Sequence, residues 1–291
     1  MLTNADQTTT LVHLLALASR LEGEGQYNLA KLARSAVDSL LRQASFQIEI
    51  PSQSDKLVGE VNKAAEALSA LGVETGLVAA LQSGAHALAE GRLPLIHETP
   101  DPFVCRTCGR LTIQEPPARC PTCGARAATF QKFPPVYWLE AYEPFAALTR
   151  LRSTPDEVGA LISGLEEAAL NTPPAPGEWA IRTTLSHLLD AQGVLGFRLG
   201  LLLEQENPVL ESKAVFQWAT DESERPPTTR EVFDTYRQSR RETLALLESL
   251  PLADWWRKGR HQEFGIVTLR QQVSYFAAHE LTHLPQIEAL R

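Results

Sequence analysis

Four cysteines in the middle of the chain have the spacing of a metal site. Cys105, Cys108, Cys120 and Cys123 are the only cysteines among 291 residues, and they form the pattern C-x2-C-x11-C-x2-C. Two C-x2-C pairs at this distance can supply four thiolates to one tetrahedral ion. A glycine follows each pair, and glycine adopts the positive φ that turns backbone amides toward sulfur. The pattern predicts a site for zinc or iron, with a pair of redox disulfides as the alternative.

Three of the seven histidines form a second candidate site. His279 and His283 are four residues apart in AAHELTHLPQI, so a helix places both imidazoles on one face. His187 lies in TTLSHLLDAQ, among leucines that indicate the interior of a bundle. A divalent ion would satisfy all three buried rings, and three ligands leave positions open for water or substrate. Zinc, nickel, iron and manganese all suit imidazole. Asp190 and Gln286 each follow a ligand by three residues and are candidates to orient it.

The segment HELTH also fits the H-E-x-x-H motif of zinc proteases, in which Glu280 would be the general base. That motif needs a third ligand further along the chain, and only eight residues follow His283. Ala289 stands where one protease class has a histidine, and Glu288 lies too close, so a protease is disfavoured. Glu280 remains a candidate catalytic residue that holds the proton of a metal-bound water. His261, in the GRHQEFG loop before the last helix, is a candidate proton donor.

The elements that position these residues are mostly helices. Residues 8–91 carry apolar side chains at three- and four-residue spacing, broken at Gly23 and Gly25, at Pro51-Ser52 and at Gly72, and predict a bundle of about four helices. Residues 101–133 are rich in Cys, Pro and Gly, and strands are expected only there. Five helical segments are predicted in the rest of the chain: 136–153, one that begins with Thr154 as N-cap and Pro155 in its first turn, 180–205, 228–250 and 268–290.

We therefore expect a mainly α protein in three parts. These are an N-terminal helical bundle at 1–91, a small four-cysteine ribbon at 101–133 and a four-helix bundle at 150–291. The formal charge of −8 argues against nucleic acid and anionic membranes as general partners. No 18-residue apolar run and no basic signal start are present. A cytoplasmic protein with a small-molecule substrate is expected, and a shared helical bundle is compatible with a homodimer.

Residues 150–291 resemble the DinB-like superfamily. PGEWAIRTTLSHLLDAQ resembles the family's Trp-x-x-Arg helix start followed by His-x-x-Asp, and the segment from Asp254 to Ile287 resembles its Gly-x-His lead-in and final His-x-x-x-His-x-x-Gln. The resemblance implies a four-helix bundle with a divalent metal on His187, His279 and His283. It also implies an activity such as the transfer of a low-molecular-weight thiol like bacillithiol, or isomerisation with mycothiol. Leu284-Pro285 departs from the pattern, because a proline removes a helix donor just past the last ligand.

The ribbon, from residue 103 to about 133, resembles the rubredoxin-like tail of rubrerythrins, on FVCRTCG, EPPARCPTCGA and Phe130. The resemblance implies an iron that passes one electron, whereas related ribbons hold zinc and only brace structure. The di-iron bundle of rubrerythrins needs paired Glu-x-x-His motifs, and residues 1–91 contain none. Three functions stay open: a metal-dependent thiol transferase or hydrolase, a rubrerythrin-like redox protein, and a non-catalytic stress-related or interaction module with structural metals.

Overall fold

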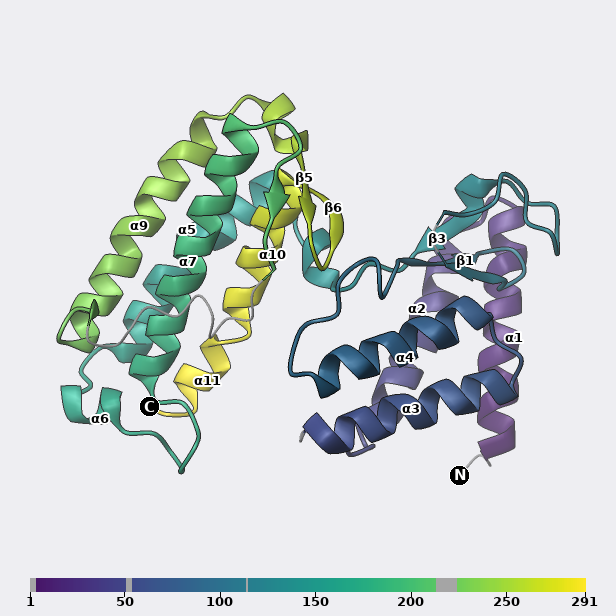
Figure 1. Ribbon diagram of the computed structural model, residues 1–291, viewed down its shortest axis with the longest axis horizontal. Helices are drawn as coiled ribbons and strands as arrows, with labels where there is room; N and C mark the ends of the chain where they lie inside the picture. The colour runs from purple at the N-terminus through teal and green to yellow at the C-terminus, as the bar shows by residue number, and fades with distance from the viewer. Residues whose placement is uncertain (1–3, 51–53, 114, 213–223) are drawn as a thin grey trace. The chain divides into compact units, whose positions relative to one another are not determined.

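The chain folds into two compact units, which the computed structural model describes over residues 4–50, 54–113, 115–212 and 224–291 (Figure 1). One unit comprises residues Met1–Pro94 and Glu98–Phe133, and the other comprises Leu95–His97 and Pro134–Arg291. Both consist mainly of helices, with small sheets, so the predicted fold class is confirmed. The cluster of four cysteines and the cluster of three histidines each fall within a single unit, so each can be described on its own.

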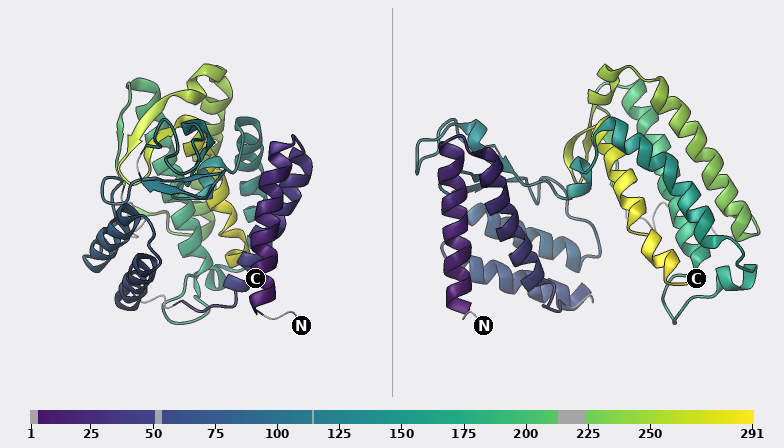
Figure 2. Two further views of the ribbon diagram at one scale, coloured as in Figure 1. Left: turned by 90° about the vertical axis from the view of Figure 1, so that its right-hand side faces the viewer. Right: turned by 180° about the vertical axis from the view of Figure 1, so that it is seen from behind.

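Four helices make up most of the first unit: α1 (Asn4–Gly23), α2 (Tyr27–Ser45), α3 (Ser54–Ala70) and α4 (Thr75–Ala89). They pack pairwise as hairpins, α1 against α2 and α3 against α4 (Figure 2). Gly25 and Gly72 sit in the two hairpin turns with φ of 73° and 70°, a conformation in which a side chain would be strained. The number of helices and these two breaks agree with the prediction, whereas the predicted break at 51–52 lies outside the described residues.

The cysteine-bearing segment forms a three-stranded antiparallel sheet in the order β2-β1-β3. Its strands are β1 (Pro102–Cys105), β2 (Leu111–Ile113) and β3 (Phe130–Lys132). Cys105 pairs with Phe130 across β1 and β3, and these two side chains pack with Cys120 in a small core. Arg106 on this ribbon donates to Glu22 of α1 at 2.8 Å, which ties the ribbon to the N-terminal helices.

The second unit is a bundle of four long helices: α5 (Pro144–Ile162), α7 (Ile181–Glu204), α9 (Thr229–Ser249) and α10 (Leu269–Leu281). Shorter helical segments flank them: η2 (Tyr137–Glu140), α6 (Glu167–Asn171), η4 (Leu252–Trp256) and α11 (Leu284–Glu288). Buried leucines of α7 such as Leu185, Leu195 and Leu199 fill the core. Thr228 begins α9 with a capping box that includes Glu231, as the Thr-Thr pair predicts.

Helix α5 corrects the prediction of a helix start at Thr154. The helix runs without interruption from Pro144 to Ile162 and contains Pro155 in its interior. A proline there leaves the carbonyl oxygen four residues earlier, that of Leu151, without its helical donor. Arg240 of α9 supplies the missing donor, since its Nη1 lies 3.0 Å from this oxygen. A tertiary contact therefore makes a proline acceptable where the local sequence favours a helix boundary.

A second small sheet corrects the expectation that strands occur only near the cysteines. It comprises β4 (Val209–Leu210), β5 (Lys258–His261) and β6 (Gly265–Thr268), with β4 parallel and β6 antiparallel to β5. Alternate residues of β5 are buried, which is the half-buried pattern of an antiparallel hairpin. The strands are too short for periodicity alone to reveal them.

The last predicted helix, 268–290, is broken into α10 and α11. The backbone departs from the helix at Thr282 and His283, and Pro285 lies in the first turn of α11. A proline has no N–H to donate to the carbonyl of Leu281, and its ring crowds that oxygen. His283 nevertheless keeps a right-handed conformation, with φ of −91° and ψ of −19°, so it stays near the face that carries His279.

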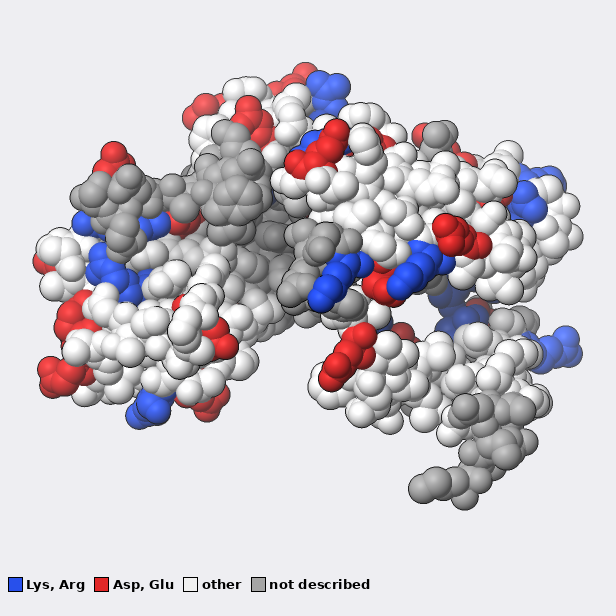
Figure 3. Space-filling model, turned by 60° about the horizontal axis from the view of Figure 1, so that its bottom comes forward, with Lys and Arg blue, Asp and Glu red and all other residues white. Residues whose placement is uncertain are grey.

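Charged side chains of both signs lie interspersed on the face shown in Figure 3. The described helices include none with both the length and the apolar character needed to cross a bilayer.

Candidate metal centres

Three histidine rings converge between α7, α10 and the start of α11. The Nε2 of His279 lies 3.3 Å from the Nε2 of His187 and 3.2 Å from the Nε2 of His283. His187 comes from the buried face of α7, and the other two rings come from the last turn of α10 and the residue that precedes α11. The predicted triad is thus assembled in space from residues more than 90 positions apart.

These distances fit one metal ion. Nitrogen ligands about 2.0–2.1 Å from a tetrahedral ion lie about 3.3–3.4 Å from each other, and the two observed spacings are 3.3 and 3.2 Å. Two neutral imidazoles can share only one hydrogen between facing nitrogens, whereas here His279 Nε2 faces two other Nε2 atoms at once. A shared cation bound through all three lone pairs accounts for this convergence.

Burial keeps the three rings neutral, which is the form that binds metals. It lowers the pKa of His187 to about 4, with the neighbouring His283 adding to the effect, and it lowers the pKa of His279 to about 3. The pKa of His283 is also lowered by burial. Each ring therefore presents a lone pair at neutral pH rather than a positive charge.

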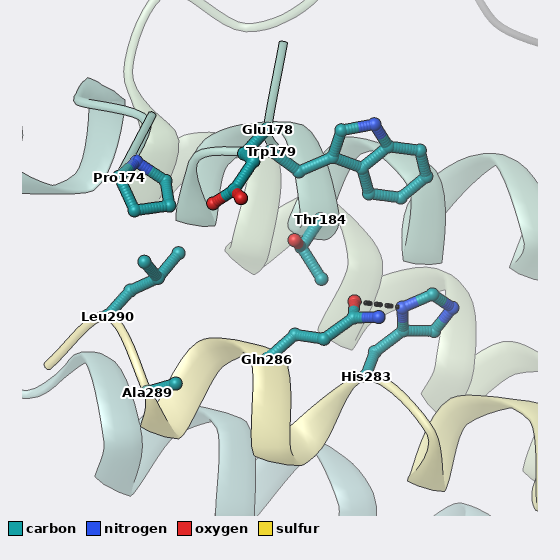
Figure 4. A pocket seen from close by; sticks show the side chains of 8 residues that line it. All are labelled: Pro174, Glu178, Trp179, Thr184, His283, Gln286, Ala289 and Leu290. Carbon is teal, nitrogen blue, oxygen red and sulfur yellow. Dashed lines mark hydrogen bonds between the residues drawn. The ribbon is translucent and has the colours of Figure 1, made fainter. Parts of the chain in front are cut away.

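Gln286 forms a hydrogen bond with the ring of His283. Its Oε1 lies 2.8 Å from Nδ1 of His283, so an Nδ1–H donated to this oxygen leaves Nε2 free for a metal (Figure 4). In the described part of the chain, the Nδ1 atoms of His187 and His279 are buried without a hydrogen-bond partner. Asp190, the other residue proposed to orient a ligand, instead forms a buried ion pair with Arg225 at 2.6 Å.

Aromatic rings surround the three histidines. Trp179 lies against His187 and His283, with ring centroids 5.3 and 6.2 Å away. Trp138 of η2 and Tyr275 of α10 flank His279 at 5.6 and 6.0 Å. Neither Trp138 nor Tyr275 is predicted from sequence motifs, although Tyr275 precedes His279 by one helical turn and so shares its face.

A pocket of about 510 Å³ lies beside His283 (Figure 4). Its lining is Pro174, Glu178, Trp179, Thr184, His283, Gln286, Ala289 and Leu290. The side of His283 that bears Nδ1 and Gln286 faces this pocket.

Glu280, predicted as a catalytic residue, lies in the bundle core. It is 1% exposed and forms an ion pair with Arg240 of α9, whose Nη1 lies 3.0 Å from Oε2. Tyr236 donates to the same oxygen at 3.3 Å. Both oxygens of the carboxylate are therefore bonded to side chains of α9. This placement gives no support to the predicted role of Glu280 in proton transfer.

His261, the predicted proton donor, lies on β5 and is 3% exposed. Its Nδ1 accepts the backbone N–H groups of Glu263 and Phe264, each at 3.2 Å. Its ring stacks on Phe264 with centroids 4.3 Å apart, and Phe264 in turn contacts Tyr275 beside His279. His261 is therefore linked to the three histidines through intervening rings.

The four cysteine sulfurs form the second centre. Sγ atoms of Cys105 and Cys123 are 3.7 Å apart, and those of Cys108 and Cys120 are 3.6 Å apart. Sulfurs about 2.3 Å from a tetrahedral ion lie about 3.8 Å from each other, so the spacing suits zinc or iron. The glycines that follow the pairs, Gly109 and Gly124, have φ of 78° and 75°, as predicted.

Backbone amides favour the thiolate form of the first sulfur in each pair. Burial alone would raise the pKa of Cys105, but the N–H groups of Cys108 and Thr107 point at its sulfur and lower the pKa to about 6. Cys120 has the equivalent amides of Cys123 and Thr122, and its pKa is also lowered. Each C-x2-C turn thus supplies the same stabilisation to its first sulfur.

Comparison with known families supports both centres. Residues 150–287 match the model of the DinB superfamily, and residues 103–131 match the model of the rubrerythrin rubredoxin-like domain. The two resemblances expected from the sequence are thereby confirmed. The three histidines and the four cysteines all lie within the matched ranges.

Individual relatives match the C-terminal half. Proteins from Bacillus cereus (strain 03BB102) and Bacillus mycoides (strain KBAB4) are 26% and 25% identical over 144 residues, or 50% of this chain and 83% of each relative. Their names describe inferred metal-dependent hydrolases. Among solved structures, YfiT from Bacillus subtilis is described as a probable metal-dependent hydrolase with an unusual four-helix bundle topology. It is 20% identical, with a TM-score of 0.46, and the match covers 50% of this chain and 85% of YfiT.

Proposed function

We propose that the C-terminal unit is a divalent-metal-dependent enzyme that hydrolyses a small molecule or transfers a thiol. The observation that carries the proposal is the convergence of three neutral imidazoles: Nε2 of His279 lies 3.3 Å from Nε2 of His187 and 3.2 Å from Nε2 of His283, and the three ligand atoms lie within 4.8 Å of one another. A divalent ion held there supplies Lewis acidity, which lowers the pKa of a water or a thiol bound to it. The names of the relatives support hydrolysis, and the family resemblance also supports thiol transfer.

The chain's own groups have distinct parts in this proposal. Gln286 fixes the orientation of the His283 ring through Nδ1. Trp138, Trp179 and Tyr275 line the centre with apolar ring faces, which exclude bulk water and strengthen electrostatic interactions within it. The pocket beside His283 offers room for a small substrate. Glu280 is given no proton transfer here, because it is paired with Arg240.

The test is metal analysis of the untagged protein together with a His283→Ala variant. We expect the wild type to hold one metal ion in each centre and the variant to keep only the ion of the four cysteines. His86→Ala is the matched control, since His86 is an exposed histidine of α4, and it should keep both ions. A His283→Ala protein with its full metal content would show that the three-histidine assignment is wrong.

Activity is then compared between the metal-loaded wild type and His283→Ala, with ester and amide hydrolysis in one screen and transfer of low-molecular-weight thiols in another. Loss of one activity in the variant identifies the reaction class. Metal binding without either activity would favour a non-catalytic module whose metals stabilise the fold. The thiol substrate and a homodimer are part of the proposal and are checked by these screens and by light scattering.

The match to a rubredoxin-like domain favours a second candidate function, electron transfer by iron in the ribbon. Zinc has no redox chemistry, so the metal decides between this function and a structural ribbon. A coloured protein whose visible absorption bleaches on reduction supports electron transfer. A colourless protein with only zinc in the ribbon would exclude it.

A further inference from the structure

A buried arginine that forms no ion pair with any described carboxylate lies where α7, α10 and β5 meet. Arg198 is 6% exposed. Its guanidinium donates to Oε1 of Gln272 at 3.1 Å and to the backbone oxygen of Glu211 at 2.8 Å. Its Nε–H has no hydrogen-bond partner in the part of the chain that the structure describes. Other arginines of this unit form ion pairs with described carboxylates, whereas Arg198 forms none with them.

Two further buried donors next to Arg198 also lack acceptors among the residues that the structure describes. Gln272 is fully buried, and because its Oε1 accepts from Arg198, its Nε2 is a donor without a partner. His261 accepts two backbone N–H groups at Nδ1, so its neutral ring carries hydrogen on Nε2, which is buried and unpartnered. The charge of Arg198 contributes to the lowered pKa of His261, which places the two groups near each other.

No carboxylate of the described residues forms an ion pair with this guanidinium. Burial lowers the pKa of Arg198, and the nearby Tyr275 and Glu263 counteract this only in part. The Glu263 carboxylate is instead bonded by the hydroxyl of Ser212 at 2.7 Å. A buried guanidinium remains charged, and burying a charge without a counter-ion is costly. An anion from outside the protein would remove that cost and also satisfy the neighbouring donors.

This donor cluster shares a helix interface with the three histidines. On α10, Gln272, Tyr275 and His279 follow each other at three- and four-residue spacing, and on α7 Arg198 lies eleven residues after His187. Both spacings are close to whole helical turns, so these residues line the same faces. At 1.5 Å per residue, the cluster lies about 10 Å from the histidines along α10 and about 16 Å along α7. Tyr275, stacked on His279, stands between the two.

We propose that Arg198, His261 and Gln272 form an anion-binding site that holds the carboxylate or oxyanion group of the substrate. The substrate is then an elongated anionic molecule whose reacting end meets the three-histidine centre. The assignment of the anion to a substrate rests on the proposed function, whereas anion binding itself does not.

The test uses the full-length, metal-loaded protein and the melting temperature of its C-terminal unit, read by tryptophan fluorescence, since all five tryptophans lie between residues 134 and 291. The probes are sodium phosphate, sulfate and acetate, with sodium chloride holding the ionic strength constant. We expect the melting temperature to rise with the concentration of at least one probe. Which probe acts distinguishes an oxyanion such as phosphate from a carboxylate.

Arg198→Gln should abolish this rise and, in chloride alone, should melt no lower than the wild type, because it removes an uncompensated charge. Arg152→Gln is the matched control: Arg152 is an exposed arginine of α5, and its variant should respond as the wild type does. An equal rise in Arg198→Gln would mean an adventitious ion only. An Arg198→Gln protein that melts below the wild type in chloride would show that protein groups already compensate the charge. Either result overturns the proposal.

His261→Asn provides a second variant if Arg198→Gln does not fold. Asparagine keeps an acceptor for the two backbone N–H groups but lacks the Nε2 donor, so the affinity for the active probe should fall on the order of tenfold. A wild type insensitive to all three probes would mean that water satisfies these donors, and the proposal would fail. Metal content is measured in parallel. Arg198→Gln should keep its metal, and His283→Ala should keep its response to the anion. Failure of the anion site can therefore be distinguished from failure of the three-histidine metal site.

Discussion

Glu280 and Arg240 are each 1% exposed and form an ion pair between α10 and α9. Arg240 also donates to Gln192 of α7 at 2.7 Å and to the oxygen of Leu151 on α5 that Pro155 leaves free, so it connects α9 to the other three long helices of the bundle. Glu280→Gln would leave the guanidinium buried without a counter-ion, and we expect the free energy of unfolding to fall by about 3–5 kcal/mol. Urea unfolding followed by tryptophan fluorescence measures this loss.

Glu242→Gln, an exposed glutamate of α9 bonded by Gln238, is the control and should change stability by less than about 0.5 kcal/mol. A Glu280→Gln protein of unchanged stability that loses its catalytic activity would restore the catalytic role predicted for this residue.

His261 gives the C-terminal unit a dependence on pH. Burial, aided by the charge of Arg198, lowers its pKa from 6.5 to about 3. Between these values the unfolded chain binds a proton that the folded chain does not, so stability is greatest above pH 6.5 and falls as the pH drops toward 3. The slope from this one residue is about 1.4 kcal/mol per pH unit. The contribution of His261 is measured by comparing the free energy of unfolding of the wild type and of His261→Asn from pH 7 to 4. If this free energy depends on pH equally in both proteins, the prediction is wrong.

At the scale of elements, β5 packs tightly against the end of α7 and β4. A Cβ on Gly259 would lie 2.9 Å from Cδ2 of Leu202 and 3.2 Å from the side chain of Leu210, both fully buried. Gly259→Ala should therefore destabilise the C-terminal unit by about 1–3 kcal/mol.

Gly193, on the exposed face of α7, is the matched control for Gly259. Nothing lies within 4 Å of a Cβ built there, so Gly193→Ala should stabilise the helix by about 0.5–1 kcal/mol. Thermal unfolding by tryptophan fluorescence should thus shift in opposite directions for the two substitutions. If both melting temperatures shifted in the same direction, close packing around β5 would not be what excludes a side chain at position 259.

The helices were predictable where the local signals were strong. The Thr228 capping box and the apolar face of α7 indicate their helices from the sequence alone. Short strands such as β5 carry too few residues for a pattern, and Pro155 reads locally as a helix start. Only the donor from Arg240, 85 residues further along the chain, makes that proline part of a helix interior.

At the scale of the whole molecule, the two centres lie in different compact units, the four cysteines in one and the three histidines in the other. We expect two separate unfolding transitions in calorimetry. Cys120→Ser should lower only the transition of the N-terminal unit, because a ribbon of this size depends on its metal. The fluorescence transition should stay in place, since tryptophan is confined to residues 134–291. A fluorescence shift in Cys120→Ser would mean that the units unfold together.

The sequence by itself determined which cysteines and histidines cluster in the two centres, because C-x2-C turns and an i, i+4 histidine pair are local geometries whose spacing is set along the chain. It also determined the mainly helical fold and both family resemblances. The tertiary structure decided what the remaining polar residues do. Whether Glu280 is free to move a proton, or Arg198 has a counter-ion, depends on side chains brought from distant helices. Burial and pairing of charge are properties of the packed molecule, and no spacing along the chain encodes them.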